Sequence, residues 1–346
     1  MPYLSLYLEG ISRERNEVHL VYWNRDLQDE DLSSVEGVKL HQFRAYQEDE
    51  VSKASKIKSF LKFKKFVKSV LKENFDFIVV LQSVTAVLMA DVLLSKRFKN
   101  NYIYDYRDCT YESNRLYRAV VEALVRGSRA TIVSSAGFKK YLPESEKIKL
   151  AHNLLSEDLK AAGGFSSGRG DGNKIRIGFW GFLREEKINK EIVKRLANDP
   201  RFELHYYGRE QKTALALKTF VSQSKIENVF FHGEYNPSEK QDIIKNTDII
   251  HNLYCEAGMP LAMSNKFYDG VIFTKPQACM AGSFMGEVVQ KNKVGIALNP
   301  ESESFAEELY EYYKSVDYGA LKESCSQLLE KIKAEQANVI SIIEKL

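Results

Sequence analysis

Four polar residues stand close together in the stretch "SNKFYDGVIFTKP": Ser264, Asn265, Lys266 and Asp269. Ser264 is a suitable N-cap for a helix that runs from Asn265 to about Val271. The positive end of such a helix attracts an anion, and Lys266 adds a charge. One turn further in, the Asp269 carboxylate can accept hydrogen bonds from two vicinal hydroxyl groups of a ribose. An acid in the first turns of a helix also needs no function, because the helix dipole favours it there.

A second anion-binding element is indicated by "GFLREEK", a glycine turn that joins an apolar strand to a helical segment. Gly181 supplies the turn, Arg184 offers a planar fork for two phosphate oxygens, and Lys187 adds a point charge. Basic residues near a helix start are often merely solvated. Together with the predicted helix start at Ser264, however, this turn predicts a diphosphate site.

The elements that must position these residues alternate between short apolar runs and longer segments of helical period, the pattern of parallel α/β units. The predicted strands cover 18–23, 76–81, 101–106, 130–135, 147–152, 174–181, 202–208, 228–233, 248–254, 275–280 and 294–298. From Ser302 onward the apolar spacing predicts helices.

The glycine- and serine-rich stretch 161–173 predicts a linker between an N-terminal domain, 1–160, and a C-terminal domain, 174–346. The last helix is expected to pack back on the N-terminal domain.

The strands predicted for the N-terminal domain do not include the first strand that such a domain normally has. A doubly wound sheet normally opens with a central strand and a glycine turn before its first helix, whereas Pro2 and Tyr3 already read as the start of that helix. Either the chain has no such strand or its coding sequence begins upstream of Met1. Because a missing central strand leaves its neighbours unpaired, the second explanation is favoured.

Composition excludes several classes of protein. The 346 residues carry 50 basic and 47 acidic side chains, a net charge of +3, so no overall field indicates a nucleic-acid partner. The four cysteines and the acidic residues and histidines show no metal-site spacing. No apolar run reaches the roughly 20 residues that span a bilayer, and no signal peptide follows Met1. A cytoplasmic location is therefore expected.

Residues 53–75 nevertheless concentrate lysines. An apolar stripe at helical spacing consists of Ile57, Phe60, Leu61, Val67, Val70 and Leu71, and the lysines largely outside it are Lys58, Lys62, Lys65, Lys68 and Lys72. A helix that covers a sheet explains the stripe. It does not explain so many charges of one sign, or Phe63 between Lys62 and Lys64. Lysines beside aromatic residues suit an anionic bilayer, so Lys53 to Lys72 is predicted to contact a membrane surface.

A further polar cluster, Asp105, Arg107 and Asp108, lies at the carboxyl end of the predicted strand 101–106, at the sheet edge where α/β proteins bind ligands. Arg107 is expected to pair with a neighbouring acid. Asp108 is the candidate for contact with a second substrate or for a general base. His152, at the end of another strand, is expected to be a buried, hydrogen-bonded histidine.

Several ordered stretches resemble the retaining GT-B glycosyltransferases of family 4, in particular those of bacterial capsule and exopolysaccharide gene clusters. They are "IRIGFWGFLREEK", "RFELHYYGRE", "ENVFFHGEYNPSE", "TDIIHNLY", "NKFYDGVIFTKP" and "GSFMGEVVQKNKVGIAL", with "YIYDYRDCTYE" and "RATIVSSAGFKKYLP" in the N-terminal domain. The resemblance implies two Rossmann-like domains that face a central cleft. The N-terminal domain would face the acceptor, and the C-terminal domain would bind a UDP- or GDP-sugar.

The resemblance also implies roles for residues of "SNKFYDGVIFTKP". The family carries an acid three residues after a lysine and seven before a proline, the spacing of Lys266, Asp269 and Pro276, so Asp269 is implied to contact the ribose. The family's first acid, eight residues earlier, contacts the donor sugar. Leu261 stands at that position, and Glu256 is the nearest acid upstream.

The family's lysine six residues after the turn glycine corresponds to Lys187 after Gly181. Its arginine directly after the glycine is replaced by Phe182, and Arg184 can supply the guanidinium instead. In the retaining mechanism ascribed to the family, the leaving diphosphate helps to deprotonate the acceptor, without a metal or a carboxylate nucleophile. The two cations would stabilise the charge that builds on the diphosphate.

The resemblance thus implies a glycosyltransferase. The lack of metal-site spacing predicts that it needs no metal, and the lysine-rich segment predicts that it binds peripherally at the inner face of the plasma membrane. It would extend a lipid-linked saccharide of a capsule, exopolysaccharide or O-antigen. Leu261 and the absent first strand leave a second interpretation, a sugar-nucleotide-binding or partner subunit that has lost turnover. A GT-B-like sugar-nucleotide epimerase is a third. The basic segment argues against it, because a soluble substrate needs no membrane.

Overall fold

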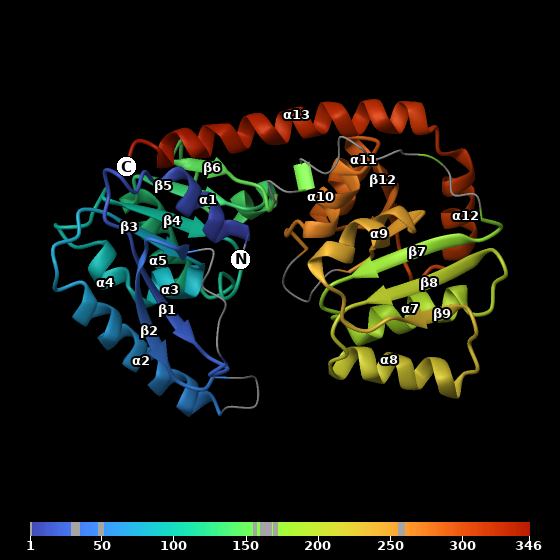
Figure 1. The fold of residues 1–346 in the computed structure, drawn as a ribbon, viewed down its shortest axis with the longest axis horizontal. Coiled ribbons are helices and arrows are strands. Elements are labelled where there is room, and N and C mark those ends of the chain that lie inside the picture. Colours follow the sequence, from blue (N-terminus) through green and yellow to red (C-terminus); the bar gives the residue numbers. More distant parts are fainter. Residues whose placement is uncertain are drawn as a thin grey trace. The chain divides into compact units, whose positions relative to one another are not determined.

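The computed structural model of the chain describes residues 2–28, 35–47, 52–154, 158–159, 168, 172–254 and 260–346. The chain divides into two compact units. Unit 1 consists of Met1–Val133, Lys139–Ala151 and Glu335–Leu346, and unit 2 consists of Ser134–Phe138 and His152–Ala334. The last helix, α13 (Tyr318–Ile343), contributes residues to both units (Figure 1).

Unit 1 contains two separate parallel ladders. The smaller one joins β1 (His19–Asn24) to β2 (Lys39–Arg44). The larger one has the order β3-β4-β5-β6, formed by β3 (Ile78–Leu81), β4 (Tyr102–Tyr106), β5 (Ala130–Val133) and β6 (Ile148–Leu150). Its helices include α1 (Pro2–Gly10), α2 (Lys53–Val70), α3 (Ser83–Leu88), α4 (Ala90–Leu93) and α5 (Arg115–Gly127).

The core of unit 1 joins both ends of the chain to the four-stranded sheet. Leu6 and Tyr7 of α1 share one buried cluster with Ile103 of β4 and with Val339 and Ile343 of α13. Helix α1 begins at Pro2, as the sequence predicts, and proline suits the first position of a helix because its missing N–H would have no intrahelical partner there.

Helix α2 shows where the stripe prediction is wrong. Phe63 is 7% exposed and stacks on Trp23 of β1, with ring centroids 5.3 Å apart, so it belongs to the core and not to the lysine-rich face. Ile57 and Leu61, assigned to the core stripe, are instead 63% and 59% exposed. The β1–β2 pair is narrow, and it covers only part of an 18-residue helix.

Unit 2 is built on one six-stranded parallel sheet with the order β12-β11-β10-β7-β8-β9 (Figure 1). Its strands are β7 (Ile175–Trp180), β8 (Phe202–Tyr207), β9 (Val229–Phe231), β10 (Ile249–Asn252), β11 (Gln277–Met280) and β12 (Gly295–Leu298). Its helices include α7 (Glu186–Leu196), α8 (Lys212–Gln223), α9 (Lys240–Lys245), α10 (Asn265–Ile272), α11 (Phe284–Lys291) and α12 (Phe305–Ser315). One buried cluster joins α7, α8 and α12 to the sheet, and a second joins it to α9, α10, α11 and α13.

The α/β fold and each predicted strand are confirmed. Strand β2 was missed, because its sequence "KLHQFR" is polar and four of its six residues are exposed in the small ladder. The predicted linker lies almost wholly outside the described residues. Among the described helices, none is both long and apolar enough to cross a membrane.

Candidate functional site

The sheet order of unit 2 places the two predicted anion-binding elements side by side. β7 lies between β8 and β10, and the direction in which strands are added reverses between β7 and β10. Open α/β sheets bind ligands at the carboxyl ends of strands at such a switch point. The turn after β7 holds Gly181 and Arg184, whereas Lys187, which the sequence places in the turn, lies in the first turn of α7; the segment after β10 leads into α10.

Glycine is required where the turn after β7 meets the turn after β8. Gly181 has a φ of +104°, which residues with a Cβ rarely adopt. Its N–H donates to the Tyr207 carbonyl at 2.9 Å. A Cβ added at Gly208 would lie 2.1 Å from the Gly181 carbonyl oxygen, whereas a Cβ added at Gly181 would meet no described atom within 4 Å. The backbone at Gly181 is therefore open to a ligand.

Asn189 of α7, which sequence reasoning missed, holds this turn in place. Its side-chain N–H donates to the Arg184 carbonyl at 2.7 Å, and its carbonyl oxygen lies 3.1 Å from both the Tyr206 hydroxyl and the His251 Nε2. Nδ1 of His251 accepts from the Leu253 N–H at 3.0 Å, so Nε2 carries the proton. Burial lowers the pKa of His251 to about 3, which keeps this ring neutral.

The start of α10 is fixed to the sheet. Ser264 Oγ accepts from the Phe267 N–H at 3.0 Å and donates to Asn252 Oδ1 at 2.9 Å. The Asn252 amide in turn donates to Gln277 of β11 at 2.8 Å. The predicted helix and its cap are confirmed, and Asn265 is exposed at the first helical position.

Lys266 is a buried cation at the start of α10. It is 9% exposed, and its ammonium lies 4.1 Å from the centre of the Phe179 ring and 5.1 Å from that of Tyr254. Burial lowers the pKa of Lys266 to about 8; Asp269 acts in the opposite direction, and the Arg184 guanidinium lowers it further. An anion bound at this end of α10 would compensate the charge of the buried ammonium.

Asp269 is 3% exposed and already holds two partners. One carboxylate oxygen accepts from the Trp180 indole at 2.9 Å, and the other pairs with the Lys240 ammonium at 2.6 Å. Lys240 also pairs with Asp158 at 2.9 Å. Burial raises the pKa of the Asp269 carboxyl, while Lys240 acts in the opposite direction. A ribose hydroxyl would have to use the remaining lone pairs of this carboxylate.

Three more residues of unit 2 were singled out from the sequence: Lys187, Leu261 and Glu256. Lys187 is 82% exposed at its side chain and pairs with Glu301 at 3.1 Å. Leu261 is half-buried in the segment that leads into α10. Glu256 lies outside the described residues.

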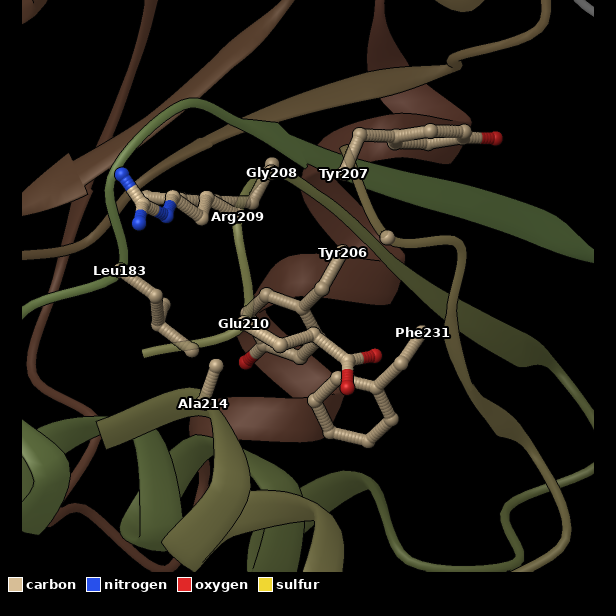
Figure 2. A pocket seen from close by; sticks show the side chains of 10 residues that line it. Leu183, Tyr206, Tyr207, Gly208, Arg209, Glu210, Ala214 and Phe231 are labelled. Atoms are coloured by element: carbon tan, nitrogen blue, oxygen red, sulfur yellow. The ribbon is translucent and has the colours of Figure 1, made fainter. Parts of the chain in front are cut away.

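A narrow hollow of about 10 Å³ opens beside this edge of the sheet. Figure 2 shows Tyr206 and Phe231 at its base, with their rings stacked at 5.3 Å, and Gly208 and Arg209 on the turn above them. The hollow holds about one water molecule. A nucleotide base would have to bind across its mouth.

The polar cluster after β4 lies in unit 1. Asp105 is fully buried, pairs with Arg107 at 2.5 Å and accepts from the Tyr7 hydroxyl at 2.6 Å. Burial raises the pKa of Asp105, and Arg107 opposes that shift. The expected pairing of Arg107 is confirmed. Asp108 follows this pair and is partly exposed.

The hydrogen bond predicted for His152 is confirmed, since its Nδ1 lies 3.0 Å from the Tyr268 hydroxyl, but the residue is only partly buried. Sequence reasoning missed Trp180 and Lys240, the partners of Asp269. A signal near Lys240 was available, since Asn236 and Glu239 form a capping box on the short 3-10 helix Pro237–Glu239 that leads directly into α9. Among the described residues, no cluster of three or more histidines, cysteines or acids is placed to hold a metal ion.

No protein-family model matches the chain, and no curated protein matches it by sequence. Solved structures match its fold. Sucrose-phosphate synthase from Thermosynechococcus elongatus is 12% identical with a TM-score of 0.71, and the match covers 99% of this chain and 91% of that one. HepE of Anabaena in complex with UDP-glucose is 14% identical with a TM-score of 0.64, covering 99% and 96%. UDP-GlcNAc 2-epimerase from Neisseria meningitidis bound to UDP-GlcNAc is 12% identical with a TM-score of 0.52, covering 96% of each chain.

At these identities the likeness establishes the fold. The chain has the GT-B fold, with a four-stranded parallel sheet in one unit and a six-stranded parallel sheet in the other. An epimerase shares this fold with transferases. The activity must therefore be argued from the site.

Proposed function

We propose that the chain is a retaining glycosyltransferase that moves a sugar from a UDP- or GDP-linked donor to a lipid-linked saccharide, in the synthesis of a cell-surface polysaccharide. The observation that carries the proposal is the switch point of the unit 2 sheet, where the open backbone at Gly181 follows β7 and the buried Lys266 stands at the Ser264-capped start of α10 after β10. A diphosphate is the ligand that a helix start with a buried cation favours. HepE and the epimerase, which share the fold, were solved with UDP-linked sugars.

In this reaction the bond between the sugar C1 and the diphosphate oxygen breaks, and a bond from C1 to the acceptor oxygen forms on the same face. The acceptor proton passes to a phosphate oxygen, so negative charge builds on the diphosphate before that transfer. Arg184 and Lys266 stabilise this charge, and Lys187 adds to the field when it leaves Glu301. Asp269 orients the nucleotide through its ribose. Asp108 of unit 1 serves the acceptor, and the N-terminal domain, 1–160, is the acceptor domain.

The test of the proposal is transfer of a radiolabelled sugar. The purified chain, incubated with labelled UDP- and GDP-sugars and a lipid extract, should move label into the organic phase and release one nucleoside diphosphate for each sugar transferred. A binding subunit would retain nucleotide and transfer nothing. An epimerase would return the label in an isomeric sugar nucleotide, and either result would contradict the proposal.

The lipid-linked acceptor places the enzyme at a membrane, and the exposed face of α2 is the proposed contact. Ile57 and Leu61 lie one turn apart and are both exposed, beside the exposed lysines Lys58, Lys62 and Lys65. Lys64 and Lys68 are instead paired with Asp91, at 2.9 and 2.6 Å. Two large apolar side chains rimmed by cations suit the boundary between lipid headgroups and acyl chains. Peripheral attachment to the inner, cytoplasmic face of the plasma membrane follows from this proposal.

We expect the chain to sediment with vesicles that contain phosphatidylglycerol and to remain in the supernatant with phosphatidylcholine vesicles. Replacing both Ile57 and Leu61 with serine should weaken the binding about tenfold or more, because each side chain loses its transfer into the acyl region. Replacement of Leu215, 50% exposed on α8, with serine is the matched control and should change nothing. Equal recovery of the unaltered chain in the supernatant with both vesicles would contradict the membrane contact.

A further inference from the structure

An exposed apolar pair stands where the segment after β4 leads into α5 of unit 1. Leu116 is 81% exposed, the highest value for a large apolar side chain among the described residues, and Tyr111 is 61% exposed. The two are neighbours, because the Tyr111 ring lies edge-on to that of Tyr117, the residue after Leu116, with centroids 5.5 Å apart. A single exposed apolar side chain needs no explanation, whereas neighbouring ones mark a contact site.

A buried carboxylate anchors the segment that carries Tyr111. Glu112 is 1% exposed, and one of its oxygens accepts from the Thr110 N–H at 2.5 Å and from the Cys109 thiol at 3.2 Å. The other oxygen accepts from the hydroxyl of Ser83, in α3, at 3.3 Å. Since Glu112 is turned inward and bonded on both oxygens, its neighbour Tyr111 is held toward solvent.

The start of α5 fixes Leu116 in a similar way. The side-chain oxygen of Asn114 caps the helix and accepts from the Leu116 N–H at 2.9 Å and the Tyr117 N–H at 3.2 Å. The Tyr117 hydroxyl lies 2.9 Å from that of the buried Ser83, so Tyr117 faces the interior and Leu116 faces water. A large apolar side chain held outward in this way gains free energy when a partner covers it.

The charge around the pair is positive. Helix α5 carries three arginines, Arg115, Arg118 and Arg126, and a single acid, Glu122. Arg115 is exposed beside Leu116, and Arg118 lies 4.0 Å from Glu122, a distance at which an exposed ion pair contributes little. Tyrosine and leucine rimmed by arginine suit the surface of an anionic bilayer, where the apolar side chains enter the headgroup boundary and the guanidinium groups meet lipid phosphates.

We propose that Tyr111 and Leu116 form a second membrane contact, which inserts into an anionic bilayer and brings the carboxyl edge of the unit 1 sheet to the lipid surface. The inference rests on the proposed transfer to a lipid-linked saccharide. Asp108, the proposed acceptor residue, lies in the same segment, directly after the buried pair Asp105 and Arg107. A saccharide attached to a membrane lipid then reaches Asp108 without leaving the bilayer.

The first experiment measures the depth of an indole introduced into the full chain. Leu116→Trp is mixed with phosphatidylglycerol vesicles whose acyl chains carry bromine, which quenches an indole that enters the acyl region. The matched control is Leu215→Trp, at a position 50% exposed on α8 of unit 2, and the unaltered chain gives the background from Trp23 and Trp180. Beyond that background, Leu116→Trp should lose fluorescence and Leu215→Trp should not.

The second experiment removes the apolar side chains. Tyr111→Ser combined with Leu116→Ser should weaken binding to phosphatidylglycerol vesicles about tenfold or more, because both side chains lose their transfer into the apolar layer. Leu215→Ser should leave the binding unchanged. An unaltered thermal unfolding midpoint shows that the double variant is folded.

The inference is overturned if Leu116→Trp is not quenched, or if the double serine variant binds vesicles as tightly as the unaltered chain. It is also overturned if that variant keeps its vesicle binding but turns a dimer seen by light scattering into a monomer, because a second copy then covers the pair. Neither experiment contains a sugar donor. Quenching without sugar transfer therefore upholds the contact and contradicts the proposed reaction, whereas transfer without quenching does the reverse.

Discussion

Replacement of Asp269 by alanine should lower the free energy of unfolding by about 3 kcal/mol or more, because it takes one partner from a largely buried ammonium group. Lys240, whose side chain is 17% exposed, would keep only Asp158, and the buried Trp180 indole N–H would lose its acceptor. Urea denaturation measures the loss. Combination with Lys240→Ala should cost less than the sum of the two single changes, since the pair is removed together.

Asp269→Asn separates the structural role of this residue from binding. The amide keeps the volume, and its one oxygen can still accept from Trp180, while Lys240 keeps Asp158; this variant should therefore fold, with a smaller loss of stability than Asp269→Ala. It loses the charge-assisted hydrogen bonds proposed to reach the ribose, and its affinity for UDP and GDP should fall about tenfold or more by calorimetry. Unchanged affinity in a folded Asp269→Asn chain would remove the ribose contact and leave the contact with Lys240 as the function of the residue.

The fold was predictable because its signals are local. Each predicted strand is a short apolar run bounded by turns, and glycines such as Gly181 mark where the chain reverses, whereas the polar β2 carries no such signal. The prediction of which α2 side chains pack on the sheet was wrong in part. Helical spacing identifies an apolar stripe, but the width of the partner sheet decides how much of the stripe is covered. The β1–β2 ladder covers Phe63 and leaves Ile57 and Leu61 exposed.

The sequence predicted which segments form the candidate site, but not which residues contact one another within it. Ser264 and the Gly181 turn were readable because caps and turns depend on neighbours in sequence. The sequence did not predict the partners of Asp269 or the hydrogen bonds of Asn189, because these contacts depend on the order of the strands in the sheet. Trp180, 89 residues before Asp269 in the chain, reaches it because β7 and β10 are adjacent in the sheet.

In both units, the order of the strands decides which candidate residues come together. In unit 2, β7 and β10 together create the edge at which Arg184 and Lys266 meet. In unit 1, the corresponding edge follows β4 and holds the buried pair Asp105 and Arg107, which Tyr7 ties to α1.

Arg184→Met should lower the kcat of sugar transfer by about 100-fold to 1,000-fold, the usual effect of removing one group that stabilises developing charge. The same change should move the pH dependence of diphosphate affinity. Burial sets the pKa of Lys266 at about 8, and Arg184 contributes to lowering it. In the unaltered chain, affinity for UDP should fall as pH rises through about 8, because Lys266 loses its proton. Without the Arg184 charge the pKa rises, so the fall should occur at higher pH.

Two further variants test whether the shift of the pH midpoint is caused by the loss of the Arg184 charge. Arg184→Lys keeps a positive charge and should keep the midpoint near that of the unaltered chain. Lys194→Met removes an exposed cation from α7 that pairs with Glu191, and it should alter neither kcat nor the midpoint. If Arg184→Met lowered kcat without moving the midpoint, Arg184 would act through the shape of the turn that Asn189 holds. The two cations would then not share one diphosphate.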